Sequence, residues 1–337
     1  MSDVSSGRVL YPYPWQKEQW QQTLAMYRAN RLASGYLVCG QEGVGTLFFA
    51  QALAAWLLCQ SEHKNGDRAC GQCKGCQLMM SGNHPDFLMV EPQAPSHFIK
   101  IGQIRALNDF ARKTAQLGGL RIIILHPAEV MNVNASNALL KSLEEPGNET
   151  LFLLVTERSH DLLPTIRSRC QSLSFGRPDQ QQAIDWLSKQ VDDIGSVNDL
   201  LRLAAGNPLT ALAFDKEGVL QSYQRLINDI KKLFKGKTTP AELAKQWEKA
   251  DVTGILLWLA NWMKDVARLS LRCDPSRVQN KDMQAFLGYV AKKSSARSVV
   301  EVHDWLLEQR HYLLEGSNLN RLLLLETAFC RYIDLVF

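Results

Sequence analysis

The 337-residue sequence has no hydrophobic run long enough to cross a membrane. Its most apolar stretches, residues 50–59 and 255–263, are far shorter than the roughly 18 to 20 residues that a spanning helix needs. Residues 1–15 are polar and aromatic, and they lack the basic flank and apolar stretch of a secretory signal. We therefore expect a protein that stays in the cytoplasm and has no membrane contact.

A large excess of charge of one sign is also absent. The chain has 38 Lys and Arg residues against 34 Asp and Glu residues, a net charge of +4. Such a balance does not attract a whole protein to nucleic acid, so any contact with DNA must depend on local patches or on partners. One basic patch is the run Lys231, Lys232, Lys235 and Lys237, which is either a solvated helix end or a contact site for DNA or a partner.

The order of the expected elements changes near residue 176. Short apolar runs that read as strands occur before this point, and segments with helical periodicity lie between them: strands at 36–39, 87–90, 121–125, 151–155 and 172–175; helices at 46–59, 101–116 and 134–143. This alternation predicts an α/β domain over residues 1–176, with a parallel sheet flanked by helices. Helical patterns alone follow, and they predict a small all-α lid over 177–214 and an all-α domain over 215–337.

A glycine loop between the first strand and the next helix has the spacing of a phosphate-binding loop. Gly40 and Gly45 are separated by four residues, and Gly43 lies between them. A working loop continues with Lys, which neutralises phosphates, and then with Ser or Thr, which ligates Mg²⁺. Here Thr46 and Leu47 occupy these positions, so the cation and the metal ligand are both missing. The alternative is a tight turn in an unrelated α/β protein.

The acid that helps to hold Mg²⁺ in such enzymes is missing as well. It would follow the strand at 121–125, but His126 stands there, and the nearest acid, Glu129, lies past the strand end. Two separate losses thus affect the same chemistry. Together they favour a phosphate-loop fold that retains its shape and has no functional ATP/Mg²⁺ site.

Four of the eight cysteines form a cluster that is typical of a metal site. Cys59, Cys70, Cys73 and Cys76 have the spacing of a four-thiolate Zn²⁺ site, which is closed and structural because no coordination position stays open. The insert at 59–76 is therefore expected to be a zinc module. Four free thiols are one alternative. A nucleic-acid-binding finger is another, although no recognition helix with several basic side chains follows the cysteines.

Three segments together resemble a known family. Residues 137–146 (NALLKSLEEP) are similar to the helix after the second nucleotide strand of clamp-loader ATPases, and residues 168–170 are similar to their Ser-Arg-Cys motif. The cysteine insert is similar to their zinc module. Over residues 15–215 the chain resembles the bacterial clamp-loader family of AAA+ proteins, and within it the subunits that lack ATPase activity. Leu209 stands where this family places a lid arginine that senses the nucleotide.

The resemblance implies a role inside a ring of subunits. It implies that the domain at 215–337 is an oligomerisation collar, and that Arg169 is an arginine finger acting in trans on a neighbour's ATP. The implied partners are the delta and gamma/tau subunits of DNA polymerase III and, through the complex, the beta sliding clamp and primer-template DNA. Three alternatives stay open: Arg169 as a surface residue paired with an acid, an ATPase with an unusual phosphate loop, and a zinc-containing DNA-binding module.

Overall fold

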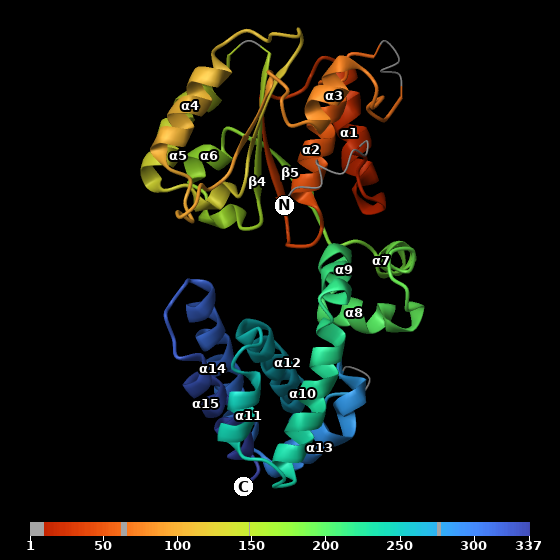
Figure 1. Ribbon diagram of the computed structural model, residues 1–337, viewed down its shortest axis with the longest axis vertical. Coiled ribbons are helices and arrows are strands. Elements are labelled where there is room, and N and C mark those ends of the chain that lie inside the picture. The colour runs from red at the N-terminus through yellow and green to blue at the C-terminus, as the bar shows by residue number, and fades with distance from the viewer. Residues whose placement is uncertain (1–9, 62–65, 148, 275–277) are drawn as a thin grey trace. The chain divides into compact units, whose positions relative to one another are not determined.

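The chain folds into two compact units, Met1–Phe214 and Asp215–Phe337. The structure, a computed structural model, describes residues 10–61, 66–147, 149–274 and 278–337 (Figure 1). Within these ranges no helix has the length and apolar character needed to cross a membrane.

A five-stranded parallel sheet forms the centre of the first unit. Its strands lie in the order β2-β3-β4-β1-β5 and are β1 (Gly35–Gly40), β2 (Phe87–Val90), β3 (Arg121–Leu125), β4 (Thr150–Thr156) and β5 (Gln171–Phe175). Every residue of β3 and β4 is buried, as expected for strands covered on both faces. The predicted parallel sheet is confirmed.

Helices cover both faces of this sheet (Figure 1). They are α1 (Lys17–Arg28), α2 (Thr46–Leu57) and α3 (Lys74–Met80) on one face, and α4 (Ile101–Ala111), α5 (Val133–Glu144) and α6 (Pro164–Arg167) on the other. Two hydrophobic cores result. One includes Trp20, Phe49 and Trp56 beneath α1 and α2, and the other includes Ile104 and Leu139 beneath α4 and α5.

Helix α4 is shorter than the predicted helix at 101–116. It ends at Ala111, and the backbone N–H groups of Gln116 and Leu117 instead donate to the carboxylate of Asp86, at 2.7 and 2.9 Å. Asp86 is fully buried, so these charge-assisted hydrogen bonds satisfy a carboxylate that water cannot reach. The chain must leave the helix to make them.

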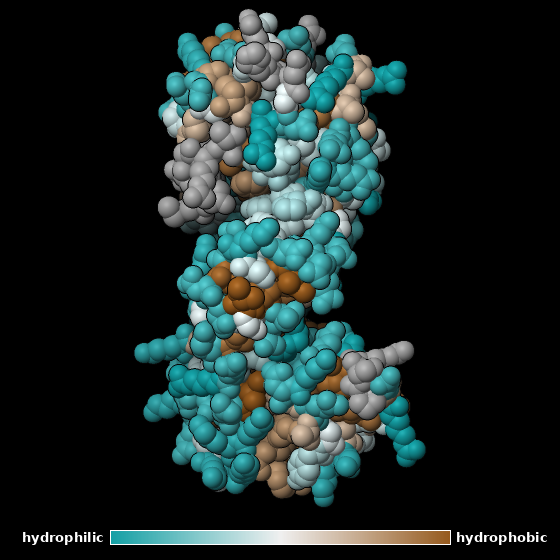
Figure 2. Space-filling view, turned by 90° about the vertical axis from the view of Figure 1, so that its right-hand side faces the viewer, coloured by the Kyte–Doolittle hydropathy of each residue, from teal (hydrophilic) through white to brown (hydrophobic). Residues whose placement is uncertain are grey.

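Three helices follow the sheet: α7 (Gln180–Leu187), α8 (Val197–Leu203) and α9 (Pro208–Lys216). The segment up to Phe214 belongs to the first unit by its contacts. Figure 2 shows a hydrophobic patch at the height of these helices. Among their connecting residues, Ile194, between α7 and α8, is 67% exposed.

The second unit is helical, without strands, in the part of it that the structure describes. It contains α10 (Val219–Phe234), α11 (Pro240–Trp247), α12 (Val252–Ser270), α13 (Gln284–Lys293), α14 (Ala296–Leu314) and α15 (Arg321–Ile333). A chain of hydrogen bonds crosses its core: Trp262 Nε1 donates to Tyr223 Oη at 2.9 Å, and Tyr223 Oη donates to Asn280 Oδ1 at 2.8 Å. The predicted fold class, an α/β sheet domain followed by all-α segments, is confirmed.

Candidate functional site

The glycine loop lies where the sequence predicts it, between the end of β1 at Gly40 and the start of α2 at Thr46. Gly43 and Gly45 have φ values of 81° and 82°, a region that glycine enters at little cost. The loop therefore has the strand–turn–helix geometry that presents backbone N–H groups and a helix N-terminus to an anion.

The chain itself covers this loop. From the N-terminal segment, Trp15 Nε1 and Gln16 Nε2 both donate to the carbonyl of Val44 at 2.9 Å. A Cβ atom added to Gly45 would lie 2.7 Å from the ring of Tyr13, and one added to Gly43 would lie 2.2 Å from Thr210 Oγ1 of α9. The segment before α1 and the helix α9 thus pack tightly against the loop.

No cation stands at the two positions that follow the glycines. The side chain of Thr46 is directed toward Gly40, where an added Cβ would lie 2.6 Å from Thr46 Cγ2. Leu47 packs against the hydrophobic core beneath α1 and α2. Neither side chain supplies the positive charge or the metal ligand of a working phosphate loop.

Carboxylates surround the loop instead. Glu42 belongs to the loop, Glu157 follows β4, and Glu129 Oε1 accepts a hydrogen bond from the backbone N–H of Glu157 at 3.2 Å. Burial of the carboxyl group, then the charges of Glu42 and Glu129, raise the pKa of Glu157 to about 7. Two arginines lie here as well: Arg158 acts on Glu157 in the opposite direction, and Arg177 Nε donates to Gln41 Oε1 of the loop at 2.8 Å.

His126 directly follows β3, where a magnesium-binding acid would stand. Its backbone N–H donates to the carbonyl of Val90 at 3.0 Å, and its Nδ1 lies 3.7 Å from Glu91 Oε1. Burial lowers the pKa of His126, which favours the neutral imidazole. Mg²⁺ prefers oxygen ligands, so this side chain does not replace the missing acid.

Arg169 lies at the other end of the sheet. Gly40 pairs with Phe175 and Tyr36 with Gln171, so Arg169 precedes the strand end that is farthest from the loop. The length of β5 alone separates them by about 13 Å, at roughly 3.3 Å per residue. The structure therefore does not bring Arg169 to the loop of its own chain.

The guanidinium of Arg169 has two partners at the surface. Its Nη1 donates to the carbonyl of Thr165 at 2.8 Å, and its Nη2 forms an ion pair with Glu144 at the end of α5. The Arg169 side chain is 33% exposed and that of Glu144 is 49% exposed. Arg167, the last residue of α6, is exposed too, and the backbone turns between the two arginines.

The four clustered cysteines come together in space. Their sulfur atoms all lie within 4.8 Å of one another, with Cys59 Sγ 3.8 Å from Cys73 Sγ and Cys70 Sγ 3.9 Å from Cys76 Sγ. Four thiolates at about 2.3 Å from a tetrahedral Zn²⁺ are about 3.8 Å apart. The four sulfurs thus fit the size of a zinc site.

Backbone N–H groups surround these sulfurs in the manner of a thiolate cluster. The N–H group of Cys70 donates to Cys59 Sγ at 3.4 Å. The N–H group of Cys73 donates to Cys70 Sγ at 3.3 Å, and that of Cys76 donates to Cys73 Sγ at 3.4 Å. Hydrogen bonds from the N–H groups of Gln72 and Cys73 lower the pKa of Cys70 to about 6, whereas burial raises the pKa of Cys76. Cys59 follows α2 and Cys76 belongs to α3, so a bound metal would join these helices.

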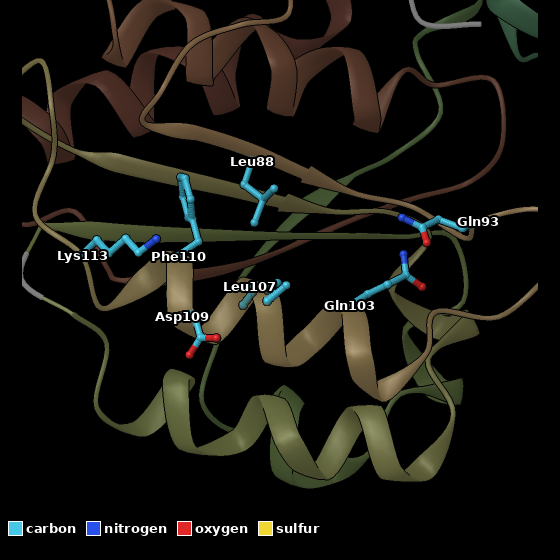
Figure 3. Close-up of a pocket in the computed structure, with 8 residues that line it drawn as sticks. Leu88, Gln93, Gln103, Leu107, Asp109, Phe110 and Lys113 are labelled. Atoms are coloured by element: carbon cyan, nitrogen blue, oxygen red, sulfur yellow. The ribbon is translucent and has the colours of Figure 1, made fainter.

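A pocket at the edge of the sheet was not predicted from the sequence. It has a volume of about 460 Å³, and Figure 3 shows Leu88 of β2 facing Leu107 and Phe110 of α4, with Gln93 and Gln103 at one end. Strands β3 and β4 separate β2 from β1 and its loop, so this pocket is not part of the phosphate site. Apolar residues on an edge strand and the adjacent helix were the only signal in the sequence.

Known proteins resemble this chain over nearly its whole length. The sequence family described as DNA polymerase III, delta subunit, matches residues 15–179, and the family described as its C-terminal region matches residues 217–332. DNA polymerase III subunit delta' of Pseudomonas aeruginosa is 38% identical over 325 residues, which cover 96% of this chain and 98% of that protein. The chain belongs to the delta' family of DNA polymerase III.

Other delta' proteins agree with this assignment. The Escherichia coli K12 protein is 30% identical over 321 residues, which cover 95% of this chain and 94% of that protein. Among solved structures, a DNA polymerase III gamma subunit-related protein of Thermotoga maritima is 19% identical, with a TM-score of 0.46 and coverage of 93% and 99% of the two chains. The resemblance to clamp-loader subunits, predicted from three motifs, is confirmed, and the chain is a clamp-loader subunit of the delta' type.

Proposed function

We propose that this delta' chain does not hydrolyse ATP and presents Arg169 to a nucleotide held by a neighbouring subunit. The position of Arg169 carries the proposal, because the length of β5 separates it from the loop of its own chain while its side chain lies at the surface. In this role the chain assembles with the delta and gamma/tau subunits and helps to load the beta clamp onto primed DNA. We place this activity in the cytoplasm, where bacterial chromosomes are copied.

The chemistry of an arginine suits this role. Its planar guanidinium stays charged and can bind two phosphate oxygens, which stabilises the charge that develops when the terminal phosphate is transferred. Leaving Glu144 costs little, because exposed ion pairs contribute only about 0 to 1 kcal/mol. The pair with Glu144 therefore does not prevent Arg169 from turning toward a phosphate of a neighbouring subunit.

The residues around the glycine loop argue against the alternative that this chain is an ATPase with an unusual phosphate loop. Trp15, Gln16 and Thr210 pack against or hydrogen-bond to the loop, and the carboxylates of Glu42 and Glu129 lie near it. A nucleotide would have to displace the covering side chains and overcome this charge without a lysine. We infer that the loop supports the fold rather than a reaction.

A structural Zn²⁺ held by Cys59, Cys70, Cys73 and Cys76 is the second part of the proposal. Four protein ligands close the metal shell, so the ion would stabilise the insert and would not activate a substrate. A DNA-binding role for this insert is less well supported. The guanidinium of Arg68 lies 4.1 Å from the ring centroid of Tyr11 and is thus engaged within the chain.

The helical unit offers an assembly surface on α14. Val300, Leu307 and Leu314 stand at intervals of seven residues and are 46%, 38% and 58% exposed. Apolar residues at this spacing form one stripe along a helix, which is the pattern of helix-to-helix association. We propose that this stripe packs against a helix of another subunit and forms part of the collar.

The deciding experiment compares Arg169→Ala with Arg167→Ala in a reconstituted loader of delta, gamma/tau and this chain. A trans finger contributes about 10³ to 10⁵ in rate at the nucleotide it serves. We expect Arg169→Ala to slow clamp loading on primed DNA at least about tenfold, with assembly unchanged by size-exclusion chromatography. Arg167→Ala removes the same charge two residues away and should load clamps at the wild-type rate.

A third variant, Glu144→Gln, removes the ion pair between Arg169 and Glu144 and leaves Arg169 itself unchanged. It should keep or raise the loading rate, because Arg169 retains its charge and loses only a surface ion pair. If Arg169→Ala and Arg167→Ala load clamps equally fast, Arg169 is a surface residue and the trans role is wrong.

A further inference from the structure

A second pocket, in the helical unit, lies at the basic run 231–237. It has a volume of about 460 Å³ and opens between the end of α10 and the start of α13, which lie side by side in Figure 1. Its lining residues are Lys231, Phe234, Lys235, Asp282, Ala285, Phe286 and Tyr289. The proposed clamp-loading role uses none of them.

Aromatic rings form the apolar wall of this pocket. Phe234 of α10 and Phe286 of α13 pack edge to face, with ring centroids 4.9 Å apart and planes at 90°. Tyr289, one turn further along α13, is 45% exposed. A ligand that covers exposed aromatic surface beside a concavity is favoured, because it removes apolar area from water.

Of the four lysines in the basic run 231–237, one is paired with an acid of the described part of the chain. Lys232 donates to the buried carboxylate of Asp229 at 2.8 Å. Lys231, Lys235 and Lys237, in contrast, form no ion pair with any residue in the described part of the chain. Cations do stabilise the C-terminal end of a helix such as α10, but this effect does not require an aromatic pocket beside them.

We propose that this pocket binds an acidic peptide segment of a partner protein through one bulky apolar side chain. That side chain would enter the concavity against Phe286 and Tyr289, and flanking carboxylates would pair with Lys231 and Lys235. A nucleic acid fits less well, because Phe234 and Phe286 pack edge to face and form a wall rather than an open platform for stacking bases. The proposal is independent of Arg169 and of the zinc site.

The experiment measures fluorescence anisotropy of a labelled ten-residue peptide, with one central phenylalanine flanked by glutamates, against the full chain. We expect saturable binding that weakens as NaCl is raised, because ion pairs at a surface are screened. Replacing the peptide's phenylalanine by alanine, or its glutamates by glutamines, should each abolish most of the binding.

Two matched variants locate the site. Lys231→Glu with Lys235→Glu should weaken binding about tenfold or more, since two attractive pairs become repulsive. Lys245→Glu with Lys249→Glu makes the same charge change at the same spacing outside the pocket lining, and it should bind like the wild type. Tyr289→Ala, at an exposed position that tolerates truncation, should weaken binding severalfold without a change in circular dichroism.

Three results would overturn the proposal. The first is no saturable binding of the peptide to the wild-type chain. The second is equal loss of affinity in the two double-lysine variants, which would show only a general charge effect. The third is displacement of the peptide by a twenty-nucleotide oligothymidylate that binds more tightly than the peptide. That result would assign the pocket to single-stranded DNA.

Discussion

Single side chains near the glycine loop carry the charge opposite to the one a nucleotide requires. A working loop places a lysine where Thr46 stands, whereas Glu42, Glu129 and Glu157 bring carboxylates to the same region. Burial, and after it the charges of Glu42 and Glu129, raises the pKa of Glu157 to about 7. The carboxylates and the missing lysine support the proposal that this loop does not hydrolyse ATP.

The raised pKa of Glu157 predicts a pH-dependent effect on stability. The folded chain keeps this carboxyl protonated up to about pH 7, whereas the unfolded chain releases the proton near 4.5. Glu157 therefore destabilises the fold increasingly as the pH rises between these values. We expect Glu157→Gln to be neutral near pH 5 and to stabilise the protein above pH 7, by at most about 1 kcal/mol because the residue is partly solvated.

Urea unfolding at pH 5 and pH 8 measures this difference. Glu217→Gln, a change at an exposed glutamate in the other unit, serves as the control and should shift the midpoint equally at both pH values. A stabilisation by Glu157→Gln that is the same at pH 5 and pH 8 would show that the carboxyl of Glu157 is not shifted.

At the scale of the elements, the stability of the cysteine insert should depend on a bound metal. Helix α3 has only seven residues, which is too short to be stable alone. The hydrophobic cluster around it contains the buried residues Cys59, Ala69 and Cys76, with Cys73 packed against them. Such a small core stabilises little, so a metal shared by the four sulfurs would provide the cohesion that apolar packing does not.

Removing the metal should therefore destabilise the first unit. We expect the purified, reduced chain to contain about one Zn²⁺ per molecule. Cys76→Ser should lose it and lower the thermal midpoint by about 5 to 10 °C, corresponding to a loss of about 2 to 3 kcal/mol. Metal analysis and calorimetry measure the two effects.

Cys273→Ser is the matched control, since Cys273 lies in the helical unit outside the cluster. It should retain the zinc and the wild-type midpoint. A folded chain that contains no zinc while its thiols are intact and reduced would contradict the structural-site proposal.

At the scale of the whole molecule, assembly should depend on the stripe on α14. Burying a leucine side chain contributes about 1.5 to 3 kcal/mol, so Leu307→Glu with Leu314→Glu should weaken association with the other subunits by at least tenfold, a loss of about 1.4 kcal/mol. Both positions are exposed, and the isolated chain should keep its thermal midpoint. Size-exclusion chromatography of the reconstituted complex measures the loss.

Ile194→Glu provides the comparison, because Ile194 is the more exposed residue at 67% and lies in the other unit. This variant should assemble normally if association depends on α14. Equal assembly of the α14 variant and the wild type would instead show that the collar contact lies elsewhere on the helical unit.

Much of the fold was predictable because its signals are local. Buried parallel strands are short apolar runs, and the glycines at 43 and 45 mark a turn with positive φ. The shortening of α4 was not predictable, because it depends on Asp86, about 30 residues away in sequence, accepting hydrogen bonds from residues 116 and 117. The pockets at 88–113 and 231–289 were missed for a similar reason, since each combines residues from separate elements.

The sequence by itself determined the chemistry of this protein: the missing lysine and acid, the four cysteines at metal spacing, and the motifs shared with clamp-loader subunits. All of these are properties of residue type and spacing. Only the tertiary structure decided which of them act together. It brings four sulfurs within 4.8 Å, covers the loop with Tyr13 and Thr210, and keeps Arg169 at the far end of β5. Those distances depend on how strands pair and helices pack, which spacing along the chain does not specify.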